Sequence, residues 1–272
     1  MATPQIDCVF FDCDDCLYKN NWATMKLLTS KISQYTEAKL GLSGEEVYEL
    51  FKKHGTTLCG LVKEGHLRED QVDEFLETVH DVSLDFGPDP ELRSMLAEIQ
   101  RPRWVFTAST PSHAKRCLQA LGIEDMFCGI ISASSRTMID QVGYVSKHDP
   151  RCFAKAMELA GVPPEKASSC LFFDDSVSNL RTAKKMGWRT VLVGLRARDT
   201  GALIECEAAD MAVDTIHEIR STCPEIFQLA QKKIADVARP NRNRVRVLKP
   251  IESSPVRRVR RKASEVDSPT SV

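Results

Sequence analysis

Residues 9–18 read VFFDCDDCLY, and this stretch contains two overlapping patterns. Cys13 and Cys16 form a C-x-x-C, which is the spacing of redox couples and of half-sites for zinc. Asp12 and Asp14 form a D-x-D that directly follows a short apolar run typical of a buried strand. The two patterns predict different chemistry, so the rest of the chain has to decide between them.

Apart from residues 19–85, the chain alternates between strand and helix patterns. Short apolar runs that end at polar residues predict strands at 6–11, 104–108, 128–132, 170–173, 190–194 and 209–213. Helical spacing fills the intervals, and a last helix is expected to run through Ile219 or as far as Ala235. Such alternation predicts an α/β fold with a doubly wound, Rossmann-like parallel sheet covered by helices on both faces.

Residues 19–85 show helical patterns only. Met25, Leu28 and Ile32 recur at helical spacing, and Ser43 with a glutamate three residues later is typical of a helix start. This block lies between the first strand and the remaining strands, which indicates an inserted all-helical cap. We therefore expect a core domain made of residues 1–18 and 86–237, with the cap at 19–85.

Residues 238–272 differ from the rest of the chain in composition. They contain 10 Lys and Arg against 3 Asp and Glu, a net charge of +7, whereas the remaining chain carries −8. Large apolar residues are rare in this basic tail, so we expect it to be disordered. Its charge is compatible with contact to nucleic acid or to an import receptor, and equally with a solubilising role.

The 272-residue chain has the composition of a soluble globular protein, with 42% hydrophobic and 28% charged residues. Its apolar runs are too short to cross a bilayer, and its first eleven residues lack the features of a secretory signal. We expect a cytoplasmic protein without membrane contact, with the nucleus as a second location. The ten cysteines are scattered through apolar contexts, which favours packing in the core over disulfides.

Polar residues follow several of the predicted strands, and the fold would bring them to one edge of the sheet. They are Asp12 and Asp14 after the first strand, Thr107 after the second, Asp174 and Asp175 after the fourth, and Lys147 before a helix. Four converging carboxylates repel each other unless a cation joins them, and oxygen ligands favour Mg²⁺ over zinc. With a hydroxyl and a lysine added, they predict a site for a phosphoryl group.

Each piece taken alone has an ordinary structural explanation. An aspartate after a strand is a common turn residue or helix cap, and a single lysine is usually a solvated surface residue. The joint pattern is much more specific, because all the segments occur at the end of a strand or the start of a helix. The C-x-x-C has no second cysteine pair at zinc spacing. The sequence therefore favours the carboxylates.

The segments VFFDCDDC, WVFTAS, SKHDP and LFFDDSVSN, in this order, resemble the four motifs of the haloacid dehalogenase superfamily of phosphohydrolases. The similarity covers roughly residues 6–224. The stretches DDCLY, HGTTLCGL, PDPELR and TVLVG further resemble the pyrimidine 5′-nucleotidase-like branch of that superfamily. This resemblance implies a Mg²⁺-dependent phosphatase that works through an aspartyl-phosphate.

The resemblance also implies a role for each motif residue. Asp12 would be the nucleophile, and Asp14 would protonate the leaving alkoxide and later activate water. Thr107, the adjacent Ala108 and Lys147 would form the phosphate-binding positions. Because a halide leaves without a proton whereas an alkoxide needs one, the second aspartate favours a phosphatase over a dehalogenase.

A magnesium site is implied by the same motifs. Its ligands would be the carboxylate of Asp12, the backbone carbonyl of Asp14 and the carboxylate of Asp175, with Asp174 ligating directly or through water. Asn179 would orient these ligands from outside the coordination sphere. The metal would allow two anions, a carboxylate and a phosphate, to approach each other.

The cap would select the leaving group of a small phosphomonoester, with a nucleoside 5′-monophosphate as the first candidate. Asn20, His54, Thr56 and Thr57 are candidate substrate contacts in the cap, although each is equally typical of a helix cap or a solvated surface.

Three positions depart from the pattern of the superfamily. Cys16 replaces a threonine, Ala108 an asparagine and His148 a proline, and each change could slow the reaction. The alternative function is therefore a non-catalytic regulator that keeps the fold and acts through its basic tail.

Overall fold

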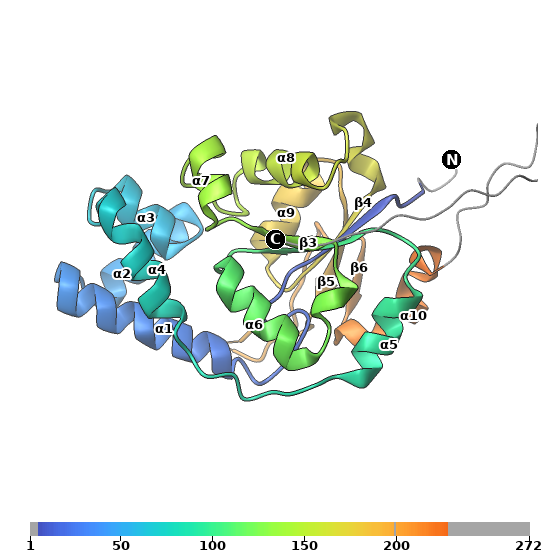
Figure 1. Cartoon of the computed structure of the whole chain (residues 1–272), viewed down its shortest axis with the longest axis horizontal. Helices are drawn as coiled ribbons and strands as arrows, with labels where there is room; N and C mark the ends of the chain where they lie inside the picture. Colours follow the sequence, from blue (N-terminus) through green and yellow to red (C-terminus); the bar gives the residue numbers. More distant parts are fainter. Residues whose placement is uncertain (1–4, 199, 228–272) are drawn as a thin grey trace, which may run out of the picture. The chain divides into compact units, whose positions relative to one another are not determined.

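Six parallel strands form the sheet in the computed structural model, which describes residues 5–198 and 200–227 (Figure 1). The strands are β1 (Cys8–Phe11), β2 (Arg103–Thr107), β3 (Gly129–Ser132), β4 (Cys170–Asp174), β5 (Arg189–Val193) and β6 (Met211–Val213). Their order is β3-β2-β1-β4-β5-β6, so β1 pairs with β2 on one side and with β4 on the other. The predicted doubly wound parallel sheet is confirmed. The order reverses beside β1, which is where ligands bind in such sheets.

Ten α-helices accompany the sheet in the described part of the chain. They are α1 (Ala23–Tyr35), α2 (Gly44–His54), α3 (Thr57–Lys63), α4 (Val72–His80), α5 (Pro90–Glu98), α6 (Pro111–Leu121), α7 (Arg136–Val142), α8 (Pro150–Leu159), α9 (Val177–Lys185) and α10 (Ile219–Thr222). None of these helices is long and apolar enough to span a membrane.

The two faces of the sheet bury separate apolar clusters, because neighbouring residues of a strand point to opposite sides. Val9 and Phe11 of β1 pack in the cluster that contains α5, α6 and α10. Phe10 packs in the cluster that contains α7, α8 and α9. Helices therefore cover both faces, as the sequence predicts (Figure 1).

Helices α1 to α4 lie between β1 and α5 in the sequence and share an apolar cluster of their own. Tyr35 on α1 packs edge to face on Phe75 of α4, with ring centroids 5.2 Å apart. Ser43 begins α2 with the expected capping box, in which the Glu46 carboxylate accepts a hydrogen bond from the Ser43 backbone. The segment predicted to be purely helical is helical.

The two chain segments that connect α1–α4 with the sheet are joined to each other. Asn20 donates a hydrogen bond to Asp85 over 2.6 Å. Tyr18 stacks on Phe86, with ring centroids 4.0 Å apart. Asn21 and Trp22 adopt φ of 56° and 57°, so the chain turns sharply before α1 begins.

Some elements differ from the expectation. Short helices α3 and α7 were not predicted. The last helix ends at Thr222, because the residue before a proline is driven out of the helical region and Cys223, which precedes Pro224, has φ −126° and ψ 55°. The extension to Ala235 and the predicted tail at 238–272 lie outside the described residues.

Trp188 occupies the centre of one cluster, and replacing it with alanine is expected to lower the free energy of unfolding by about 3–5 kcal/mol. Its ring lies 4.5 Å from that of Phe10 and 5.1 Å from that of Phe153, centroid to centroid. Urea unfolding measures the loss. Leu203→Ala is the control, because Leu203 is 68% exposed and its truncation leaves no cavity. A loss below about 1 kcal/mol for Trp188→Ala would contradict this picture of the core.

Candidate active site

The residues predicted from the strand ends lie together at the carboxyl edge of the three central strands. Asp12 directly follows β1, Thr107 ends β2 and Asp174 ends β4. A cavity of about 680 Å³ is bordered by Asp12, Asp14, Thr107, Ala108, Lys147, Asp175 and Asn179. Segments separated by more than 160 residues of sequence thus meet at one cavity.

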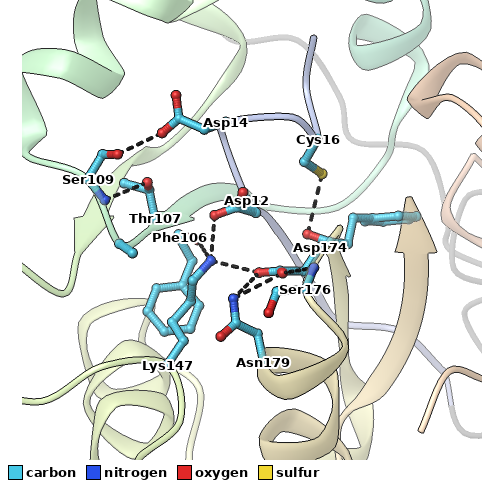
Figure 2. Close-up of polar contacts among 12 residues, drawn as sticks. Asp12, Asp14, Cys16, Phe106, Thr107, Ser109, Lys147, Asp174, Ser176 and Asn179 are labelled. Atoms are coloured by element: carbon cyan, nitrogen blue, oxygen red, sulfur yellow. Dashed lines mark hydrogen bonds and ion pairs between the residues drawn. The ribbon is translucent and has the colours of Figure 1, made fainter. Parts of the chain in front are cut away.

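Lys147 joins two of the carboxylates (Figure 2). Its ammonium donates hydrogen bonds to Asp12 and, over 2.7 Å, to Asp174. It also donates to the Phe106 carbonyl over 3.1 Å and lies 5.3 Å from the centroid of the Phe172 ring. The side chain is only 2% exposed. Lys147 is therefore a fixed, desolvated cation whose charge faces the carboxylate after β1.

Asp174 and Asp175 have different environments. Asp174 is fully buried and accepts hydrogen bonds from the Ser176 backbone over 2.8 Å and from Asn179 over 3.0 Å, besides the ion pair with Lys147. Asp175 is only partly buried and borders the cavity. Asn179 thus orients Asp174, while Asp175 borders the cavity.

The charges at this edge do not balance among the protein groups. Burial raises the pKa of Asp12 to about 8; the Lys147 ammonium opposes this rise and the Asp174 carboxylate adds to it. Burial, and after it the charges of Asp174 and Asp12, also raises the pKa of Asp175 well above its usual range. One ammonium faces three carboxylates. The surplus negative charge and the all-oxygen donor set fit a hard divalent cation.

Asp14 lies apart from this group and is held by three side chains. Tyr18 donates to its Oδ1 over 2.6 Å, His113 contacts the same oxygen through Nε2 over 2.8 Å, and Ser109 donates to Oδ2 over 2.7 Å. In Figure 2 the Asp14 carboxylate points toward Ser109, whereas that of Asp12 points toward Lys147. None of these three contacts with Asp14 was predicted from the sequence.

The contact between Asp14 and His113 is an ion pair. Burial alone would raise the pKa of Asp14, but the hydrogen bond and charge of His113, together with the hydrogen bonds from Tyr18 and Ser109, outweigh burial and lower that pKa to about 2. Burial likewise disfavours the charged form of His113, yet the Asp14 carboxylate raises the pKa of His113 to about 10. Near neutral pH Asp14 is therefore an ionised carboxylate and His113 a protonated imidazolium.

The two cysteines of the C-x-x-C contact different parts of the protein. The Cys16 thiol donates to the Phe173 carbonyl on β4 over 3.5 Å. Cys13 lies beside Cys117 of α6 and Asp14, with the ligand atoms of all three within 4.8 Å of one another. The thiols of the motif therefore do not form a pair with each other in this structure.

Three of the four cap residues predicted to contact substrate border the cavity, namely Asn20, Thr56 and Thr57. The amide of Asn20 is already engaged with Thr24 and Asp85. Thr56 caps α3 by accepting a hydrogen bond from a backbone N–H over 3.2 Å. His54 does not line the cavity, because its Nε2 pairs with Glu64 over 2.8 Å.

Ala108 and Thr107 present little free hydrogen-bonding capacity to the cavity. The Ala108 carbonyl accepts from Ser134 over 2.7 Å, and the Thr107 hydroxyl accepts from the Ser109 backbone over 3.0 Å. Both residues nevertheless border the cavity, directly beside Asp12 and Lys147. The hydroxyl hydrogen of Thr107 remains available to a ligand oxygen.

The far side of the cavity is mostly apolar and was not predicted. Side chains from α1, α2, α4 and the turn before α1 line it: Trp22, Met25, Leu28, Ile32, Phe51, Phe75 and Val79. Cationic residues from two loops also border it: Lys19, Arg196 and Arg198. A ligand anchored at Asp12 by an anionic group would therefore extend toward an apolar surface.

Residues 6–187 match the family of haloacid dehalogenase-like hydrolases, and the chain belongs to this family. The superfamily expected from the four motifs is thus confirmed. The chain is 30% identical over 200 residues to Phosphate metabolism protein 8 of Saccharomyces cerevisiae, which amounts to 67% of this chain. The aligned region spans 60% of the length of the yeast protein.

Two solved structures show the same fold. CbbY from Rhodobacter sphaeroides, as a mutant in complex with xylulose 1,5-bisphosphate, has a TM-score of 0.56 at 20% identity, over 79% of this chain and 96% of CbbY. The HAD-hydrolase YfnB of Bacillus subtilis, bound to magnesium, has a TM-score of 0.52 at 15% identity, over 80% of this chain and 99% of YfnB. At these low identities the similarity shows a shared fold.

Proposed function

We propose that the protein is a Mg²⁺-dependent phosphomonoester hydrolase that forms an aspartyl-phosphate on Asp12. The observation that carries this proposal is the position of Asp12. It lies at the end of the central strand, at the border of a cavity, in contact with the buried Lys147 ammonium. A second carboxylate, Asp14, is held two residues further on.

The proposed reaction has two steps. A carboxylate oxygen of Asp12 attacks phosphorus, the bond to the ester oxygen breaks, and the leaving alkoxide takes up a proton. Water then attacks the phosphorylated Asp12, releasing phosphate and regenerating the carboxylate. Thr107 and Lys147 bind the phosphoryl oxygens in both steps.

Asp14 and His113 supply and remove the proton as a pair. The imidazole lies 2.8 Å from the Asp14 carboxylate, and this carboxylate borders the cavity while His113 is fully buried. The leaving alkoxide therefore takes its proton through Asp14, which His113 reloads. In the second step the carboxylate accepts a proton from water.

Mg²⁺ would be held by Asp12, by the backbone carbonyl of Asp14 and by Asp175, whose carboxylate borders the cavity. Asp174 would ligate directly or through water, and its oxygens are held by hydrogen bonds from Lys147, Asn179 and Ser176. When bound, the cation offsets the charge of carboxylate and phosphate as they approach.

The substrate class that we propose is a nucleoside 5′-monophosphate, with a pyrimidine base as the first candidate. The apolar surface of the cavity suits a flat base, and Thr107 and Lys147 beside Asp12 suit its phosphate. The resemblance of the DDCLY and HGTTLCGL stretches to the pyrimidine 5′-nucleotidase-like branch supports the same substrate class.

We further propose that residues 19–85 act as a cap domain that selects this leaving group. We also propose that the protein acts in the cytoplasm, with the nucleus as a second location.

Hydrolysis of a panel of phosphorylated metabolites, with and without Mg²⁺, tests the proposal. We expect phosphate release that requires the metal and is fastest with pyrimidine nucleoside monophosphates. Uniform turnover of all esters would support a phosphatase but contradict the nucleotide preference. Absence of release from every ester would favour the alternative, a regulator acting through the basic tail.

Asn179→Ala is expected to weaken the apparent affinity for Mg²⁺ by about tenfold or more. The amide fixes Asp174 over 3.0 Å, and a carboxylate that loses its orienting partner positions the metal less well. The dependence of phosphate release on Mg²⁺ concentration measures the change. Ser178→Ala, a substitution at the neighbouring position of α9, should leave that dependence unaltered.

A further inference from the structure

A second cluster of metal-ligating side chains lies beside Asp14, away from Lys147. The ligand atoms of Cys13, Asp14 and Cys117 all lie within 4.8 Å of one another. His113 adds a fourth donor, since its Nε2 is 2.8 Å from Asp14 Oδ1 and 3.5 Å from Cys117 Sγ. The two thiols and the carboxylate converge here, and the imidazole contacts the carboxylate and the Cys117 thiol. The phosphatase chemistry above uses neither thiol.

Two distances at His113 can be compared with the edges of a tetrahedral site. With metal–sulfur bonds of about 2.3 Å and metal–nitrogen bonds of about 2.0 Å, the nitrogen–sulfur edge of a tetrahedron is about 3.5 Å. The distance between His113 and Cys117 equals this edge. The distance between His113 and Asp14 would have to open by about half an ångström, because a hydrogen bond now joins them.

Rigid elements hold the donors. His113 and Cys117 are four residues apart on α6 and therefore share one face of that helix. Cys13 and Asp14 directly follow β1, and Cys13, His113 and Cys117 are fully buried. All polar contacts of the His113 ring converge on Nε2, since its buried Nδ1 has no partner among the described residues. Tyr18 and Ser109 orient the carboxylate from outside, as outer-shell partners do at metal sites.

We propose that Cys13, Asp14, His113 and Cys117 form a binding site for a thiophilic transition metal, with Zn²⁺ as the reference ion. Two sulfur donors select such an ion over Mg²⁺, so this site is chemically distinct from the oxygen-only site at Asp12 and Asp175. The ion reaches it through the cavity, which Asp14 borders.

A bound ion would inhibit hydrolysis. Coordination fixes the Asp14 carboxylate and displaces the proton-bearing contact with His113, so the leaving group loses its proton source. This consequence rests on the proposed function, whereas metal binding itself does not.

Titration with Co²⁺ in excess Mg²⁺ and a thiol-free reductant tests the site directly. Thiolate coordination produces a near-ultraviolet charge-transfer absorption, which an oxygen-only site does not give. We expect this absorption to saturate at one equivalent in the wild type, to disappear on addition of Zn²⁺, and to be lost in Cys117→Ala and in Cys13→Ala. Cys152→Ala, which removes an equally buried thiol from the opposite face of the sheet, should retain it.

Inhibition provides a second readout. Cys117→Ala should need at least about tenfold more Zn²⁺ for half-inhibition at saturating Mg²⁺. Absence of the charge-transfer absorption from the wild type, or its persistence in both Cys117→Ala and Cys13→Ala, would overturn the proposal. Because the absorption reports binding irrespective of turnover, it remains decisive even if no ester is hydrolysed.

Discussion

Asp12→Asn is expected to reduce phosphomonoester hydrolysis by at least about a thousandfold. The amide cannot attack phosphorus as a carboxylate does, and no other described carboxylate contacts Lys147 except Asp174, whose oxygens accept hydrogen bonds from Asn179 and Ser176. Phosphate release from the best ester of the panel measures the effect. Asp7→Asn is the matched control, since Asp7 precedes β1 but pairs with Lys166 at the surface.

The same substitution is expected to stabilise the protein in the absence of metal. Asp12 is buried beside Asp174, and removing its charge relieves a repulsion that Lys147 offsets only in part. We expect the Tm of Asp12→Asn to exceed that of the wild type by at least about 2 °C without Mg²⁺, with the difference shrinking when Mg²⁺ is added. An inactive variant with a lowered Tm would instead indicate loss of structure and would contradict the predicted stabilisation.

Lys147→Met is expected to lower the free energy of unfolding by about 3–5 kcal/mol and to abolish hydrolysis. The substitution keeps the apolar stem between the rings of Phe106 and Phe172 but removes the ammonium. Two buried carboxylates, Asp12 and Asp174, then lose their shared cation. Urea unfolding without metal measures the first effect, and phosphate release measures the second.

A double variant separates charge from packing in this prediction. If the loss arises from unpaired carboxylates, Asp12→Asn combined with Lys147→Met should recover part of the stability, because only one carboxylate remains without its cation. Lys166→Met removes an exposed partner of Asp7 and should change stability far less. Equal losses in the single and the double variant would show that repulsion between Asp12 and Asp174 is not the cause.

The sheet and its edge could be predicted from the sequence because both depend on local signals. Apolar runs such as that before Asp12 mark each strand, and the carboxyl ends of parallel strands necessarily meet at one edge. Asp12, Thr107 and Asp174 therefore lie together as expected. The short helices α3 and α7 were not predicted, because seven residues give too few turns for a periodic pattern to emerge.

The surroundings of Asp14 could not be predicted in the same way. Ser109 and His113 approach it from 95 and 99 residues further along the chain, and both are residue types that occur in many loops and helix starts. Tyr18 lies near in sequence, but its hydroxyl reaches Asp14 only because the chain turns after β1. Cys117 has no motif partner in the sequence, since the helix that carries it and the loop that carries Cys13 meet only in the folded protein.

The joined connections on either side of α1–α4 add to other contacts between this helical block and the core, such as the ion pair of Arg136 with Asp73 and the hydrogen bond from Ser146 to the His54 carbonyl. Because Asn20 bonds to Asp85 and Tyr18 stacks on Phe86, the outgoing and returning chains cannot bend independently. Tyr18, which lies at this junction, also donates a hydrogen bond to Asp14, so the connection between the helical block and the sheet is bonded directly to a carboxylate of the candidate site.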